Sequence, residues 1–211
     1  AYLSAFMGVV TVFLMYKIGS AMFSKNLGLI AAALFAISPL VVIHARMPYH
    51  TSFIPLVALL LVFFIYKWVK GDIRFLPFVF FALGILYNLE LATMVFWILL
   101  MLVFAYGIIK RERWFTEAIN PKIILLSVFL FLLSVLPMII YDFKENSGFY
   151  QITAFFRLIK IYLFSGSFVL SLESMRNIFS SLFTYNERLV FLGNGAIASF
   201  LTLLGFLYLV L

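Results

Sequence analysis

Uncharged runs of apolar residues, separated by short basic gaps, fill most of this 211-residue sequence. Hydrophobic residues make up 66% of the chain and charged residues only 11%, whereas a soluble domain is about 45–50% apolar and about 25% charged. A soluble core cannot bury this much leucine, phenylalanine and isoleucine, so lipid must be the solvent. Because a helix needs about 20 residues to cross a bilayer, the runs predict about seven membrane spans in a single transmembrane domain covering 1–211. The expected spans are 1–23, 26–45, 47–66, 75–89, 91–109, 123–141 and 189–211.

The fold class expected from these runs is an all-α integral membrane protein, a polytopic helical bundle. The fourth and fifth runs are separated only by Glu90. A single helix over 75–109 would be about 53 Å long, which is too long for a hydrocarbon core of about 30 Å. The sequence therefore predicts a tight helical hairpin with Asn88 and Glu90 at its apex.

Lysine and arginine residues are distributed unequally between alternate gaps. One set of gaps contains nine of them, and the short gaps of the other set contain only Arg46. Since cytoplasmic loops carry the excess of basic residues, the richer set is expected to face the cytoplasm of a cell-membrane protein. Residues 44–50, 88–91 and 142–188 would then face outward. The nine residues are Lys17, Lys25, Lys67, Lys70, Arg74, Lys110, Arg111, Arg113 and Lys122.

The long outer loop at 142–188 contains two stretches with apolar residues at helical spacing, 150–164 and 168–183. Both stretches are typical of amphipathic helices that lie in the membrane interface. The net charge of +7 comes from residues between the spans, so it indicates topology and no nucleic-acid partner is expected. The chain has no cysteine, which excludes a disulfide framework and thiolate metal sites.

Both histidines of the chain lie close to Arg46, in the stretch His44–His50. Pro39 precedes this stretch and Pro48 lies within it, and both should interrupt regular helix. An arginine at the outer boundary suits a phosphate because its guanidinium can bind two oxygens at once. Two other interpretations stay open: Arg46 anchors the helix among lipid headgroups, or the histidines hold a metal, which their spacing supports only weakly.

Two further polar groups lie at expected outer ends of spans. Asn88 and Glu90 occupy the hairpin apex, where a carboxylate near the hydrocarbon needs a partner such as Arg46 or a histidine. Asp142 and Lys144 follow the sixth span, after Pro137. They form either an ordinary solvated start of a loop or the lining of an outward cavity. Nothing in the sequence requires a cofactor, and a divalent metal has no positive support.

The run from Leu27 to Pro39, followed by His44-Ala45-Arg46, resembles a hallmark stretch of GT-C-fold membrane glycosyltransferases. The most similar group is the relatives of protein O-mannosyltransferases and aminoarabinose transferases. In these relatives a cytoplasmic turn also leads into an alanine-rich helix that ends in Ser-Pro and is followed by an arginine. The stretch from Pro137 to Lys144 is similar to the family's proline-containing span end with an acidic-basic pair.

The resemblance implies an enzyme that moves a hexosyl or pentosyl sugar from a polyprenyl-phosphate donor to a protein, lipid or glycan acceptor on the outer face. It implies that Arg46 contacts the lipid phosphate. The remaining candidates for substrate binding, which would line the cavity, have weaker support: His44, His50, Asn88, Glu90, Asp142 and Lys144. The family's main catalytic carboxylate is expected upstream of Ala1, since the chain reads as an internal stretch of a longer protein. The alternatives are a transporter or flippase for lipid-linked sugars and a polysaccharide ligase or polymerase.

Overall fold

The computed structural model describes residues 2–47 and 49–144, together with Thr153, Arg157, Lys160, Arg176 and Ser180. Every regular element in the two continuous ranges is helical, and neither range contains a strand. The predicted all-α fold is therefore confirmed. The expected interfacial helices at 150–164 and 168–183 and the expected seventh span at 189–211 lie outside the described residues.

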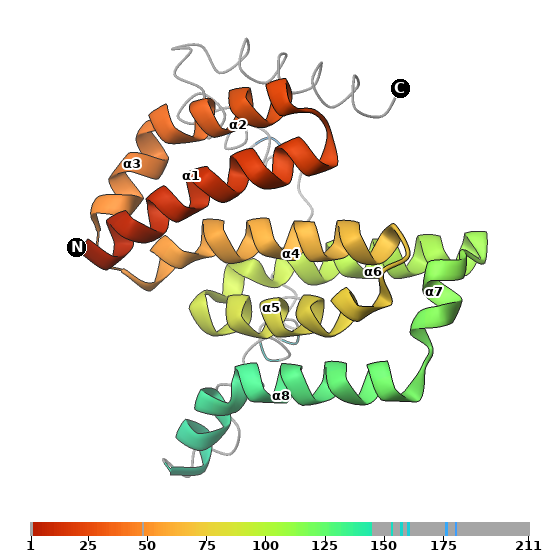
Figure 1. The fold of residues 1–211 in the computed structure, drawn as a ribbon. Coiled ribbons are helices and arrows are strands. Elements are labelled where there is room, and N and C mark those ends of the chain that lie inside the picture. Colours follow the sequence, from red (N-terminus) through yellow and green to blue (C-terminus); the bar gives the residue numbers. More distant parts are fainter. Residues whose placement is uncertain are drawn as a thin grey trace. The chain divides into compact units, whose positions relative to one another are not determined.

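The chain forms two compact units, and the described part of the first consists of three helices. Ser24 begins the second of them as an N-cap, since its hydroxyl accepts a hydrogen bond from Leu27 N–H. That helix stops at Ser38, whose backbone is extended, and a new helix starts with Pro39 at its first position. The expected interruption at Pro39 is thus present, and the run 26–45 is not one continuous helix. The three helices are α1 (Tyr2–Met22), α2 (Lys25–Ile37) and α3 (Pro39–Arg46) (Figure 1).

Glycines bring α1 and α2 together at backbone distance. A Cβ atom on Gly28 would lie 2.6 Å from Ser20 N and 2.7 Å from Tyr16 O. A Cβ atom on Gly19 would lie 3.0 Å from Gly28 Cα. Helices packed in lipid gain little from the hydrophobic effect and rely on close van der Waals contact, which small residues permit. The glycines of this unit are therefore packing residues.

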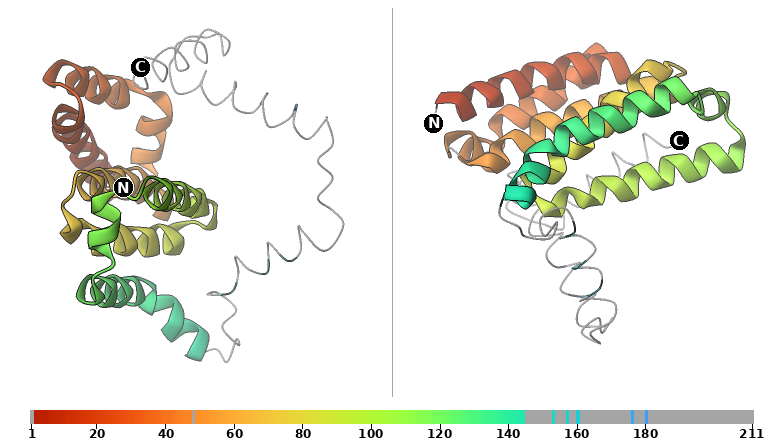
Figure 2. Two further views of the ribbon diagram at one scale, coloured as in Figure 1. Left: turned by 90° about the vertical axis from the view of Figure 1, so that its right-hand side faces the viewer. Right: turned by 90° about the horizontal axis from the view of Figure 1, so that it is seen from below.

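The second unit contains the described elements within residues 49–144. α5 (Leu76–Leu89) packs against α4 (Ile54–Val69) on one side and α8 (Pro121–Lys144) on the other, so it forms the centre of the unit (Figure 1). α8 contains Pro137 within the helix, and the bend toward its C-terminal end is visible in Figures 1 and 2. The elements are η1 (His50–Phe53), α4 (Ile54–Val69), η2 (Ile73–Phe75), α5 (Leu76–Leu89), η3 (Leu91–Met94), α6 (Val95–Lys110), α7 (Arg113–Ala118) and α8 (Pro121–Lys144).

The core of the second unit is aromatic and aliphatic. Trp68 is fully buried and meets Trp114 edge-on, with ring centroids 4.9 Å apart. Leu61 and Leu83 are also completely buried in this cluster. At the α5–α8 contact, a Cβ atom on Gly84 would overlap the Ser134 side chain. The helices of this unit are therefore held by close packing around α5.

Four helical segments in the described ranges are long and apolar enough to cross a membrane. Two shorter apolar segments, Lys25–Ile37 and Ile73–Leu89, accompany them. The third run of the sequence begins three residues later in the structure, at His50, and continues past Lys67 to Val69. Lys67 is accommodated because its ammonium lies over the Phe63 ring, 5.6 Å from the centroid. The four segments are Tyr2–Met22, His50–Val69, Leu91–Lys110 and Pro121–Lys144.

Candidate functional site

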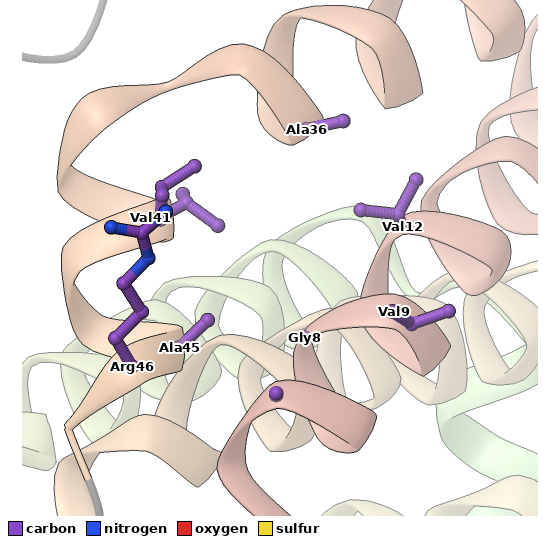
Figure 3. Close-up of a pocket in the computed structure, with 9 residues that line it drawn as sticks. Gly8, Val9, Val12, Ala36, Val41, Ala45 and Arg46 are labelled. Carbon is purple, nitrogen blue, oxygen red and sulfur yellow. The ribbon is translucent and has the colours of Figure 1, made fainter. Parts of the chain in front are cut away.

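An apolar groove lies between α1 and the broken helix α2–α3, within the first unit. Its volume is about 420 Å³, in the range of ligand sites, which is about 300–1,000 Å³. Figure 3 shows side chains from α1 and from α2–α3 facing one another across it. The groove is lined by Ala5, Gly8, Val9, Val12, Ala36, Val41, Val42, Ala45 and Arg46.

The break at Ser38 and the small residues on both walls explain the shape of this groove. α1 and α3 come close where Gly8 faces Ala45, since a Cβ atom on Gly8 would lie 3.2 Å from Ala45 Cβ. Ala5 and Ala36 also present minimal side chains. Because the chain changes direction at Ser38, α2 and α3 do not follow α1 as one straight helix. The space left between them is walled by methyl groups.

Arg46 is the charged residue among the lining residues of this groove. It is the last residue of α3 and its side chain is exposed. Its side chain runs back along α3 toward Val41 (Figure 3), the direction that helical side chains prefer. No ion pair or hydrogen bond joins it to any residue in the described ranges. A cation that lies beside an apolar wall and has no counter-ion among the described residues can bind an anionic group of a ligand.

The sequence cluster around Arg46 is divided between the two units. His44 lies on α3 with Arg46 and is partly buried. His50 begins η1 in the second unit. There His50 Nε2 lies 3.8 Å from Glu90 Oε2, with both side chains almost half exposed. A histidine is thus the partner of Glu90, one of the two kinds of partner expected.

The predicted hairpin apex is the point where α5 ends. Glu90 is extended, with φ −162° and ψ 130°, and separates α5 from η3. Asn88 Nδ2 donates to Gly84 O at 2.8 Å and to Ser134 O at 2.9 Å. These two bonds use both amide hydrogens, so Asn88 ties α5 to α8. Its observed contacts are structural rather than those of an open cavity wall.

Asp142 and Lys144 lie on the last turn of α8, because the helix continues to Lys144 instead of ending at Tyr141. Asp142 is only 2% exposed, whereas Lys144 is exposed. A solvated loop start is therefore the wrong interpretation of Asp142. In 2–47 and 49–144, no three His, Cys, Asp or Glu side chains are grouped as a metal site would require.

Sequence reasoning missed the contribution of α1, which provides one wall of the groove. Four lining residues come from this helix: Ala5, Gly8, Val9 and Val12. The signal that could have located the wall is the pair of small residues Ala5 and Gly8, three positions apart on α1. Nothing in the sequence indicated which face of α1 turns toward α3.

A comparison with protein-family models assigns residues 1–141 to the dolichyl-phosphate-mannose-protein mannosyltransferases. The chain belongs to this family. The match covers α1 to α7 and nearly all of α8, so it includes the groove, Arg46 and the His50–Glu90 pair. Searches of curated proteins and of solved structures give no significant match.

Membership confirms the resemblance to GT-C-type membrane glycosyltransferases. It also shows that the apolar helices are those of a membrane protein with glycosyltransferase character. The family description names a lipid-phosphate sugar donor and a protein acceptor. Asp142 and Lys144 lie just beyond the matched residues.

Proposed function

We propose that this protein transfers a sugar from a polyprenyl-phosphate donor to an acceptor hydroxyl on the outer face of the cell membrane. The observation that supports this most strongly is the position of Arg46. It places a guanidinium that pairs with no residue in 2–47 or 49–144 at the edge of an apolar groove. The donor has the matching chemistry, because it joins an isoprenoid chain to an anionic phosphate.

The two parts of the donor would use the two parts of the site. The isoprene units next to the phosphate would lie against the valine and alanine walls. The phosphate would accept hydrogen bonds from the Arg46 guanidinium, whose planar fork matches two phosphate oxygens. A hydrogen bond to a charged group contributes about 1.5–3 kcal/mol. The site would therefore select lipid-phosphate sugars over nucleotide sugars, which have no apolar chain.

In the proposed reaction the bond between the sugar C1 and the phosphate oxygen breaks, and a bond between C1 and the acceptor oxygen forms. The proton of the acceptor hydroxyl passes to the departing phosphate, which leaves as polyprenyl phosphate with the electron pair of the broken bond. Arg46 would stabilise the charge that grows on the leaving phosphate. His50 and Glu90 are half exposed and are proposed to contact the sugar or the acceptor.

The proposed orientation of the chain in the membrane rests on the distribution of its basic residues. Nine lysines and arginines lie in the alternate gaps that exclude Arg46, and such an excess faces the cytoplasm. Arg46, Glu90 and the C-terminal end of α8 would then all face outward. His44, Asp142 and Lys144 are proposed to face outward as well, whereas Asn88 is proposed to position α5.

Two observations at Ser38 favour a transporter of lipid-linked sugars as the second candidate. The helix broken at Ser38 is of the kind found in transporters, and the buried Ser38 hydroxyl has no hydrogen-bond partner in the described part of the chain. A transporter would move the donor lipid without breaking the bond at C1.

Transfer and transport can be separated in right-side-out membrane vesicles from cells that produce the protein. The vesicles receive a polyprenyl-phosphate mannose labelled in the sugar and a membrane-impermeant peptide with serine and threonine. We expect label on the peptide in these vesicles and background levels in vesicles without the protein. Movement of labelled lipid between leaflets with no label on the peptide would support the transporter and refute the proposed function.

A further inference from the structure

One end of the second unit gathers basic side chains from five elements. Lys67 and Lys70 lie at the C-terminal end of α4, and Arg74 lies in η2. Lys110 and Arg111 end α6. Arg113 begins α7, and Lys122 lies in the first turn of α8. Figure 1 shows these helix ends on the same side of the unit. We call these seven residues the basic end.

The residues that the structure describes do not neutralise this charge. Three acidic residues, Asp72, Glu112 and Glu117, lie in the same segments, so seven cations minus three carboxylates leave an excess of four. No ion pair joins any of the seven to an acidic residue in 2–47 or 49–144. Six of the seven are exposed, and Lys67 is partly buried against Phe63. An external anion can therefore approach the basic end.

Arg111 has an unusual backbone that points to a use for its side chain. It caps α6 in the left-handed region, with φ 49° and ψ 43°, and it is the only non-glycine residue with positive φ in the described ranges. Glycine is the usual residue at such a helix end, because a side chain there adds steric strain. Arginine at this position makes the fold less stable than glycine would. Such a cost is expected where the charge of the side chain is needed.

The basic end also lies where the apolar helices stop. α4 and α6 belong to segments long enough to span a membrane, and α8 starts another. Large apolar side chains stand next to the cations, with Ile109 77% exposed and Ile119 60% exposed. A ligand that fits both features has an anionic headgroup and an acyl chain.

We propose that the basic end binds anionic phospholipid headgroups, with Arg111 held in its strained conformation to reach them. Basic residues between spans are known to attract anionic lipid. The neighbouring apolar side chains favour a lipid over free phosphate, because phosphate cannot contact Ile109 and Ile119. This surface is separate from the groove beside Arg46 and does not depend on the function proposed for that groove.

The test uses the fluorescence of the buried Trp68 and Trp114, in the full chain with Trp97→Phe so that only these two of its three tryptophans remain. Proteoliposomes contain neutral phosphatidylcholine and increasing fractions of phosphatidylglycerol with brominated acyl chains, which quench tryptophan fluorescence. Quenching by the anionic lipid should exceed quenching by brominated phosphatidylcholine at the same fraction. A cation near an anionic surface contributes about 1 kcal/mol, so each Lys or Arg to Gln change should lower the relative affinity about fivefold.

Matched variants at the same end should move this affinity in opposite directions. Lys122→Gln and Arg113→Gln should weaken the preference for phosphatidylglycerol, and Glu117→Gln should strengthen it. Raising the salt concentration should reduce the preference in the wild type. Equal quenching by the two lipids in the wild type would overturn the proposal. The proposal would also be overturned if millimolar inorganic phosphate abolished the preference for phosphatidylglycerol, since a free anion would then be the ligand.

Arg111→Gly separates a ligand role from a structural one. Because glycine removes the strain of the left-handed cap, we expect the apparent melting temperature in neutral detergent to rise by about 2–4 °C. The same variant should lose about fivefold in relative affinity for phosphatidylglycerol. A higher melting temperature together with unchanged lipid preference would show that Arg111 does not serve lipid binding.

Discussion

Replacing Gly28 with leucine should prevent α1 and α2 from packing, and little folded protein should be recovered from detergent extracts. Even one added carbon at this position meets the backbone, 2.6 Å from Ser20 N and 2.7 Å from Tyr16 O. A backbone cannot rotate away as a side chain can, so the two helices must separate. Each excess methylene in a packed interior costs about 1–3 kcal/mol, and leucine adds more than one. The measurement is the fraction of protein that elutes as a monodisperse peak.

A graded series controls for general effects of substitution in α2. Gly28→Ala should fold but melt lower, by about 2–4 °C for each kcal/mol lost. Ala33→Leu adds a large side chain to the same helix at an exposed position, and it should elute and melt like the wild type. If Gly28→Leu behaves like Ala33→Leu, α1 and α2 do not pack as described.

The second large effect is expected at Arg46, on binding of the donor. Arg46→Ala removes the charge-assisted contact to phosphate, worth about 1.5–3 kcal/mol. The donor KM should therefore rise roughly 10- to 150-fold, at about 1.4 kcal/mol per tenfold change. Arg46→Lys keeps the charge but loses the planar fork, so its KM should lie between those of Arg46→Ala and the wild type. The measurement is the rate of sugar transfer from polyprenyl-phosphate mannose over a range of donor concentrations.

Arg113→Ala is a matched control, because it removes an exposed arginine from the opposite set of gaps. Its donor KM should equal that of the wild type. All variants should first be shown to elute as monodisperse protein. If a well-folded Arg46→Ala transfers sugar at the wild-type rate with sub-saturating donor, Arg46 serves only as an interfacial anchor.

Two of the breaks between helices could be predicted from the sequence. Prolines and charges interrupt regular helix for reasons that are local to the chain. The interruption expected near Pro39 is present after Ile37, and the break expected at Glu90 is present as the junction of α5 and η3. The family was also recognisable, because the Ser-Pro ending and the arginine after it lie within one short stretch.

The faces of the helices could not be predicted. In a soluble protein an apolar stripe marks the buried face of a helix. Here both lipid and protein neighbours are apolar, so α1 shows no such stripe, and its contribution to the groove was invisible. For the same reason the bond from Asn88 to Ser134, 46 residues away, and the burial of Asp142 could not be foreseen.

The central claim is that the groove beside Arg46 holds the phosphate end of the lipid donor. The most direct measurement places a photoreactive amino acid at Val42, in the wall of the groove, and illuminates membranes that contain radiolabelled polyprenyl phosphate. Val128 on α8, which is 49% exposed, is the control for contact with bulk lipid. We predict strong labelling from Val42 that excess unlabelled polyprenyl phosphate removes, and weak labelling from Val128 that it does not change. Equal labelling from the two positions, unaffected by the competitor, would contradict the claim.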